Sequence, residues 1–310
     1  MVESNINSFL CDGKNAFEKS KINVLSTFNG LGSIWIILDR LGIDVNKRYS
    51  SEIDKYANIV NNKNYQNTIQ LGDITKIKGS DLEQIDLLVG GSPCQGFSFA
   101  GKQLNFEDPR SKLFFEFVRL LKETKPKYFL LENVKMRKES QDIISQYLGV
   151  EPQEIHSSKF VPQNRKRLYW ANFEIEQPKQ VEYNIRDFYD GDGFPSSGTL
   201  HKNPRRVEFK RKDIFNTLTA TIWKGINASG RPAISIRESF YYDDREAHRM
   251  LTPNEMEGLQ SIPKDYTNYV SKTQRLKMIG NGWECKTVEF VLSKLANKPK
   301  EGREKSINMV

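Results

Sequence analysis

The 310-residue chain has few of the residues that build disulfide frameworks and zinc sites. It contains three histidines and three cysteines, and Cys11, Cys94 and Cys285 form no C-x-x-C pair. Both kinds of site need closely spaced groups of such residues. The sequence therefore argues against a disulfide scaffold and predicts no metal site.

The sequence also lacks segments suited to a membrane. No apolar run approaches the roughly 20 residues that a membrane-spanning helix needs. The opening residues, MVESNINSFLCDGKNAF, lack the basic-then-apolar pattern of a signal peptide. We therefore expect a cytoplasmic protein with no membrane partner.

Acidic residues are fewer than basic residues in this sequence. The chain has 47 Lys and Arg against 39 Asp and Glu, a net charge of +8. Such a balance suits nucleic acid, although a lysine-rich solvated surface produces it too. The densest basic run is LHKNPRRVEFKRK, residues 200–212. We predict that it contacts phosphates, which would make binding salt-dependent, through Arg205, Arg206, Lys210 and Arg211.

Strand-like and helix-like runs alternate along the first two thirds of the chain. Apolar runs such as INVLSTF, IDLLVGGS and KYFLLENV alternate with helical patterns such as SIWIILDRLG, EIDKYANIVNN and SKLFFEFVRLLKET. This alternation predicts an α/β fold with a Rossmann-like, doubly wound and mostly parallel sheet covered by helices on both faces.

The pattern changes after Phe173. Residues 174–248 are richer in Gly, Pro, Arg and Tyr, which predicts a second, smaller, irregular or β-rich domain. Helical patterns return at TPNEMEGLQ, with Thr252 as N-cap and Pro253 at the first helical position. A last helix is expected from about Glu284 to Asn297, followed by a disordered tail over residues 298–310.

Polar and glycine-rich segments follow the predicted strands, where an open α/β sheet binds its ligands. Phe28-x-Gly30-x-Gly32 follows the first strand, and its glycines allow a tight turn close to a ligand. Glu52 and Asp73 follow the next two strands, where they suit a ribose and an adenine amino group. The phosphate-binding G-x-x-x-x-G-K-[ST] and the full G-x-G-x-x-G are absent. The set predicts a nucleoside cofactor without a pyrophosphate, such as S-adenosylmethionine.

Further reactive side chains lie at or near other strand ends. Cys94 follows Pro93 in the polar loop GGSPCQGFSFAG, as either a reactive thiolate or an inert buried cysteine. Glu132 suits a general acid or a salt-bridged structural carboxylate. Arg165 and Arg167 are alternate residues of an extended segment, so both guanidiniums point the same way, into one site or onto a solvated patch.

Six ordered motifs carry a resemblance to a known family. They are Phe28-x-Gly30-x-Gly32, Pro93-Cys94-Gln95, Glu132-Asn133-Val134, Gln163-x-Arg165-x-Arg167, RMLTPNEMEGLQ and IGNGW. Together they resemble the cytosine-5 DNA methyltransferase family over nearly the whole chain. The GNGW segment and the short recognition region are similar to those of the animal de novo DNA methyltransferases.

The resemblance implies transfer of a methyl group from S-adenosyl-L-methionine to carbon 5 of a flipped-out cytosine in duplex DNA. Cys94 would attack carbon 6, and Glu132 would contact ring nitrogen 3, helped by Arg165, with Arg167 completing the catalytic set. The catalytic domain would be discontinuous, with residues 1–173 plus 249–297 flanking a target-recognition domain at 174–248.

The resemblance also implies binding residues. The cofactor contacts would be Phe28, Asn29, Gly30, Gly32, Glu52, Ile53, Asp73, Ile74, Ser92, Leu113, Asn281 and Trp283. The nucleotide contacts would be Pro93, Gln95, Ser98 and Asn133, with Thr217 and Leu218 of NTLTATIWKG touching DNA near the target base. Asn29 departs from the family, whose members often have a small or acidic residue there.

Two alternatives stay open. One branch of the same family methylates cytosine in transfer RNA with the same catalytic set. A catalytically inactive relative that only binds nucleic acid is the other, although such relatives usually lose the cysteine or the glutamate. We expect a monomer in solution, with a cognate restriction endonuclease as an optional partner.

Overall fold

The computed structural model describes residue 17 and residues 21–93, 109–200, 207–219, 232–235, 239–241 and 248–296. Several of the sequence predictions lie outside this part of the chain. They concern Cys94, Gln95, Ser98, Arg205, Arg206, the side chains of Lys210 and Arg211, and the tail over residues 298–310.

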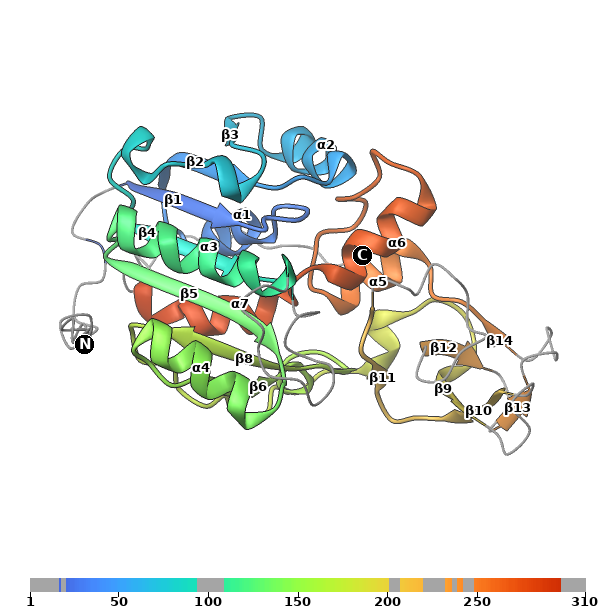
Figure 1. Ribbon diagram of the computed structural model, residues 1–310. Coiled ribbons are helices and arrows are strands. Elements are labelled where there is room, and N and C mark those ends of the chain that lie inside the picture. The colour runs from blue at the N-terminus through green and yellow to red at the C-terminus, as the bar shows by residue number, and fades with distance from the viewer. Residues whose placement is uncertain are drawn as a thin grey trace.

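A seven-stranded sheet forms the centre of the larger lobe (Figure 1). Its first five strands are parallel, and β8 runs antiparallel to its neighbours β5 and β6. The α/β architecture with a mostly parallel sheet is confirmed. In sheet order the strands are β3 (Thr68–Gln70), β2 (Val45–Ser51), β1 (Ile22–Thr27), β4 (Leu87–Gly91), β5 (Tyr128–Val134), β8 (Lys166–Ala171) and β6 (Gln153–His156).

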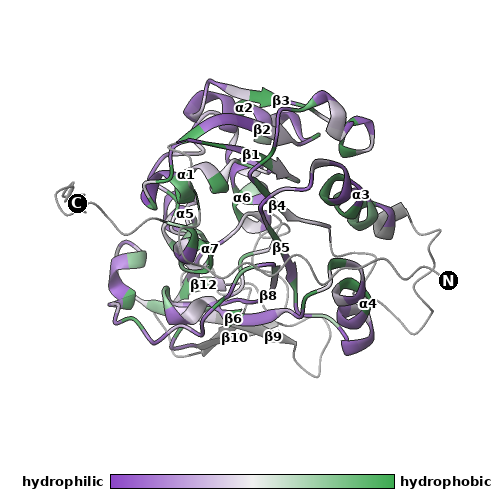
Figure 2. Ribbon diagram, turned by 90° about the vertical axis from the view of Figure 1, so that its left-hand side faces the viewer, coloured by the Kyte–Doolittle hydropathy of each residue, from purple (hydrophilic) through white to green (hydrophobic). Residues whose placement is uncertain are grey.

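Helices cover both faces of this sheet, as Figure 2 shows. Along β5, Tyr128 and Leu130 join one hydrophobic core, whereas Phe129 and Leu131 join the other. Side chains of a strand alternate between its faces, so both faces must be apolar. The helices α1 (Ser33–Arg40), α2 (Lys55–Asn64) and α7 (Cys285–Leu292) supply the first core, and α3 (Pro109–Thr124) and α4 (Lys138–Leu148) supply the second.

The C-terminal helices return to the beginning of the chain. The predicted start of α5 (Pro253–Leu259) is confirmed, because Thr252 and Glu255 form a reciprocal capping box. α7 follows the N-cap Glu284 and packs against α1. The polar sequences of α4 and of α6 (Lys272–Asn281) were not predicted as helices.

The smaller lobe carries a five-stranded antiparallel sheet, which agrees with the predicted β-rich region (Figure 1). Its strands, in sheet order, are β13 (Ser239–Tyr241), β10 (Val207–Arg211), β9 (Phe194–Leu200), β12 (Pro232–Ser235) and β14 (His248–Arg249). A separate pair, β7 (Gln163–Asn164) and β11 (Phe215–Asn216), runs parallel and joins the two lobes.

Gly90 of β4 lets α3 pack directly on the strand. A Cβ at this position would lie 2.3 Å from Thr27 Oγ1 and 3.1 Å from the Phe117 ring. Thr27 cannot rotate away freely, because it is buried and its hydroxyl donates to the Val89 carbonyl. The close contact therefore requires glycine.

We expect Gly90→Ala to lower the free energy of unfolding by about 1–3 kcal/mol, the usual cost of overpacking. Gly258→Ala in α5 is the matched control, because beyond its own helix backbone and chain neighbours the added Cβ meets no described atom within 4 Å. That substitution should be neutral or stabilising by up to ~1 kcal/mol. Urea denaturation measures both, and equal stability of the two variants would contradict the packing argument.

Candidate active site

The parallel strands end at the edge of the sheet that faces the smaller lobe (Figure 1). Phe28 follows β1, Glu52 follows β2 and Ser92 follows β4. Asp73 lies three residues after the end of β3, and Glu132 lies in β5 beside Gly91 of β4. These side chains, drawn from distant parts of the chain, gather where an open α/β sheet binds ligands.

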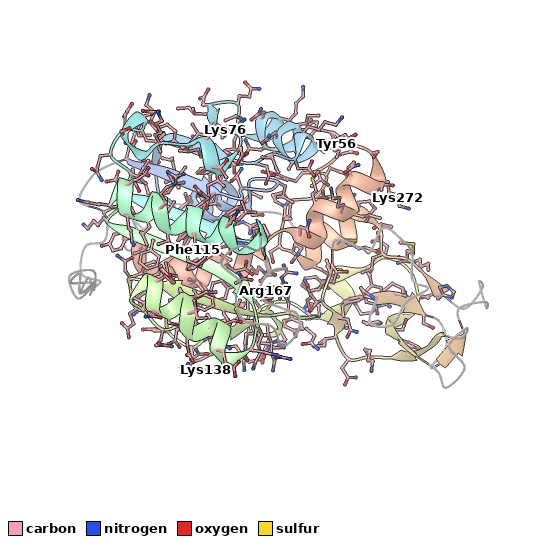
Figure 3. The ribbon with its side chains drawn as sticks, viewed as in Figure 1. Tyr56, Lys76, Phe115, Lys138, Arg167 and Lys272 are labelled. Atoms are coloured by element: carbon pink, nitrogen blue, oxygen red, sulfur yellow. The ribbon has the colours of Figure 1, made fainter. Side chains whose placement is uncertain are left out.

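Glu132 is held from two sides. Its Oε1 lies 2.9 Å from Arg167 Nε, and its Oε2 accepts a hydrogen bond of 3.1 Å from the indole N–H of Trp283. The glutamate is 8% exposed, so water competes little for these partners. Figure 3 shows Arg167 on the side of the sheet that faces the smaller lobe. A buried, doubly held carboxylate at a strand end suits hydrogen bonding to a ligand.

Arg165 takes a different direction from Arg167. Its Nη1 donates to the Leu218 carbonyl at 3.1 Å and its Nη2 to the Gly282 carbonyl at 2.8 Å. Arg165 lies between β7 and β8, where the chain turns, so strand alternation does not align the two arginines. Burial lowers the pKa of Arg165 to about 9, with the nearby charge of Arg167 adding to the effect. The guanidinium therefore stays charged at neutral pH.

Asn133 and Ser92 join the ends of β4 and β5. The Asn133 amide donates to the Ser92 hydroxyl at 3.1 Å and to its carbonyl at 3.3 Å, and the Asn133 Oδ1 accepts the Val134 N–H. Both residues are buried, whereas Pro93 is exposed. The chain therefore leaves the sheet beside Glu132, and Cys94 follows immediately, outside the described residues.

A tight turn follows β1. Phe28, Gly30 and Gly32 have positive φ angles of 53°, 56° and 87°. Glu52 fixes this turn to the start of α2, because its Oε2 accepts the Gly30 N–H and its Oε1 accepts those of Ile53 and Asp54, each at 2.8 Å. One lone pair of Oε2 stays available for a hydroxyl donor.

Asn29 is buried within the same turn. Its backbone N–H donates to the Ser51 carbonyl, and its side-chain amide donates to Asn61 Oδ1 at 3.1 Å. Asn61 also approaches Gly32, where an added Cβ would lie 2.6 Å from its Oδ1. Asn29 thus holds the turn against α2.

The surroundings of the turn fit a nucleoside. Ile53 is 80% exposed, which offers an apolar surface to a ring. Asp73 is half-buried, and hydrogen bonds from the backbone and then the side chain of Thr75 lower the pKa of its carboxyl. Apart from its chain neighbours, no atom of the described residues lies within 4 Å of a Cβ built on Gly30. Three other residues predicted to contact the cofactor differ in exposure. Ile74 is buried and Leu113 is half-buried against the same core, whereas Asn281 is exposed at the end of α6.

The segment predicted to touch DNA lies against the arginine motif. The Thr217 hydroxyl donates to the Asn164 carbonyl, and the Leu218 N–H donates to Gln163 Oε1 at 3.2 Å. The Leu218 side chain is fully buried, so we do not assign it to DNA contact. Thr217 remains half-exposed and keeps that prediction.

Two buried glutamines support the site, a role that was not assigned to them from the sequence. Gln163 donates to the Leu259 carbonyl at 2.8 Å, and Gln260 donates to the carbonyls of Ile279 at 2.9 Å and Gly282 at 3.3 Å. Both are fully buried. The sequence signal that could have indicated this role is that Gln163 lies in the motif QNRKR and Gln260 in the motif TPNEMEGLQ.

Cys285 is the inert type of cysteine. It is fully buried at the start of α7, and burial raises the pKa of its thiol to about 12.

Within the described ranges, no group of three or more His, Cys, Asp or Glu is placed to hold a metal ion. In that same part of the chain, no helix is long and apolar enough to cross a membrane.

Comparisons with known proteins match this chain to one family along most of its length. The family model for the C-5 cytosine-specific DNA methylase matches residues 22–231 and 199–297. The Type II methyltransferase M1.ScrFI of Lactococcus lactis subsp. cremoris is 31% identical over 313 residues, covering 89% of this chain and 78% of that protein. The Type II methyltransferase M.NgoBI of Neisseria gonorrhoeae is 33% identical over 295 residues, covering 86% and 90%.

The fold has solved counterparts as well. The crystal structure of the S. pombe Dnmt2 methyltransferase superposes with a TM-score of 0.68 at 18% identity, covering 88% of this chain and 98% of that one. This likeness supports the fold alone. The family match and the relatives that align along most of the sequence show that the chain belongs to the C-5 cytosine-specific DNA methylase family.

Proposed function

We propose that this DNA (cytosine-5-)-methyltransferase, which uses S-adenosyl-L-methionine, carries its chemistry on Cys94, Glu132 and Arg167. The observation that carries the proposal is the Glu132 carboxylate, held by Arg167 and Trp283 next to the strand from which Cys94 emerges. A carboxylate with both oxygens fixed and little water around it is suited to hydrogen bonding with the edge of a base.

In the proposed reaction, the Cys94 thiolate forms a bond to carbon 6 of a cytosine flipped out of the duplex. Ring nitrogen 3 takes up a proton from water, shares it with the Glu132 carboxylate in a hydrogen bond, and releases it to water when the ring is restored. Carbon 5 thereby becomes nucleophilic enough to accept a methyl group. A base then removes the proton of carbon 5, the bond to Cys94 breaks, and the aromatic ring is restored.

Bound S-adenosyl-L-methionine supplies the electrophilic methyl group. We assign its ribose to Glu52, its adenine to Ile53 and Asp73, and its amino-acid end to the turn at Gly30 and Gly32. The support is the free lone pair of Glu52, the exposed Ile53 and the open space at Gly30.

The two arginines receive different roles. Arg167 is the residue that we propose assists Glu132, because its guanidinium lies 2.9 Å from the Glu132 carboxylate. Arg165 is instead a positioning residue, since its guanidinium joins the carbonyls of Leu218 and Gly282. This departs from the sequence-based assignment, in which Arg165 helped Glu132.

The domain assignment also belongs to the proposal. The catalytic domain would comprise residues 1–173 plus 249–297, and the target-recognition domain residues 174–248. The packing of α7 against α1 supports the discontinuity. At the second boundary, Arg249 forms a bidentate ion pair with Glu255, with its Nη2 2.7 Å from Oε1 and its Nη1 2.9 Å from Oε2.

We extend the proposal to the cellular location, the oligomeric state and the partners of the enzyme. It would act in the cytoplasm as a monomer on duplex DNA, with the GNGW turn serving the cofactor as in the animal de novo enzymes. The type II relatives make a cognate restriction endonuclease the natural partner.

A covalent trap tests the proposed function. A duplex with 5-fluorocytosine at the target site has no removable proton at carbon 5, so the adduct with Cys94 should persist when cofactor is present. Intact-mass spectrometry should show one enzyme–DNA adduct, and peptide mapping should place it on Cys94. Methylation of duplex DNA and of transfer RNA is measured in parallel. Activity on RNA alone would overturn the DNA assignment, and absence of any adduct would support an inactive relative.

A further inference from the structure

Trp283 lies in a turn that is fixed on both sides. The preceding carbonyl, that of Gly282, accepts hydrogen bonds from Arg165 at 2.8 Å and from Gln260 at 3.3 Å. The next residue, Glu284, caps α7 by accepting the N–H groups of Lys286 and Thr287. With the backbone held before and after it, Trp283 has little freedom to point elsewhere.

The indole lies over the end of β4. Gly91 has no side chain there, and a Cβ would lie 3.0 Å from Trp283 Nε1 and 3.1 Å from Glu132 Oε2. Gly91 is the direct neighbour of Glu132 across the two strands. The missing side chain therefore leaves the space in which the indole N–H reaches the carboxylate at 3.1 Å.

We propose that Trp283 is a positioning residue for the catalytic carboxylate, acting through its indole N–H. This inference rests on the proposed role of Glu132. Arg167 holds Oε1 and Trp283 holds Oε2, so the carboxylate has one orientation. Each carboxylate oxygen has two lone pairs, so each keeps one that can bind a base.

The placement also couples two parts of the site. Trp283 and Asn281 belong to the turn assigned to the cofactor, and Arg165 fastens that turn to the Leu218 carbonyl beyond β11. The Glu132 carboxylate is thus oriented by a turn that contacts both the methyl-donor side and the segment leading from the smaller lobe. A phenylalanine would keep an aromatic ring in most of this space but could not donate the hydrogen bond, so the substitution tests the role of the N–H.

The test is a double-substitution cycle with Trp283→Phe and Glu132→Gln. Single-turnover methylation rates are measured with saturating cofactor and duplex DNA. Trp283→Phe should lower the rate about 10- to 100-fold, as expected for a misplaced catalytic group, with the KM for DNA changed less than two-fold. In the Glu132→Gln background the same change should cause less than a three-fold further loss, because the oriented carboxylate is already missing.

Trp170→Phe in β8 is the matched control, since it removes an indole N–H that donates to Ser145 Oγ of α4 at 3.1 Å. It should lower thermal stability and leave the single-turnover rate of the folded enzyme unchanged. A native rate for Trp283→Phe, or losses that multiply with those of Glu132→Gln, would overturn the role of Trp283. A native rate for Glu132→Gln itself would instead overturn the proposed function.

Discussion

Glu132→Gln is expected to lower the methylation rate by about 10²–10⁴-fold, the range that a positioned acid or base contributes. Glutamine keeps the shape of the side chain and an oxygen that can accept the Trp283 N–H. It removes the negative charge that Arg167 faces at 2.9 Å and the group that holds a proton at ring nitrogen 3. Single-turnover methylation of duplex DNA measures the loss.

A purely structural role for Glu132 predicts a different result. Loss of the ion pair with Arg167 would then lower the melting temperature while the folded enzyme kept its rate. Glu139→Gln, which removes an exposed carboxylate in the first turn of α4, is the matched control and should leave both quantities unchanged. The rate of adduct formation with the 5-fluorocytosine duplex gives a second reading, and it should fall in Glu132→Gln alone.

The fold was predictable because the apolar and polar pattern of the sequence matches the burial of each element in the folded protein. Apolar runs such as that of β5 must be buried on both faces, which requires a helix-covered parallel sheet. Thr252 and Pro253 mark the start of α5 in the sequence itself. α4 and α6 were missed because their apolar positions are sparse, so their helical structure depends on the surfaces against which they pack.

The candidate site was predictable in position more than in contacts. The topology brings the ends of β1, β2, β4 and β5 to one edge, so Glu52 and Glu132 had to lie near it. The separate directions of Arg165 and Arg167 depend on a break between β7 and β8 that side-chain alternation cannot reveal. The contact between Trp283 and Glu132 joins residues 151 positions apart, and no local pattern encodes such a pair.

Cys94→Ser should abolish turnover, with at least a ~10⁴-fold loss, while the affinity for duplex DNA changes little. The thiolate is the reactive form of cysteine, and a thiol titrates close enough to neutrality to supply it, whereas an unassisted hydroxyl does not. Radiolabelled methyl transfer and a gel-shift titration measure the two quantities. A near-native rate for the variant would show that Cys94 is not the nucleophile.

Cys285, the one cysteine within the described residues, provides the comparison. Cys285 is buried in the first turn of α7, which packs against α1, and burial raises the pKa of its thiol to about 12, so it stays protonated at neutral pH. Cys285→Ala should lower stability by about 1 kcal/mol through lost packing and leave the turnover of the folded enzyme intact. Opposite outcomes for the two substitutions would separate reactivity from burial within one chain. They would also assign the covalent step to the segment that leaves β4 beside Glu132.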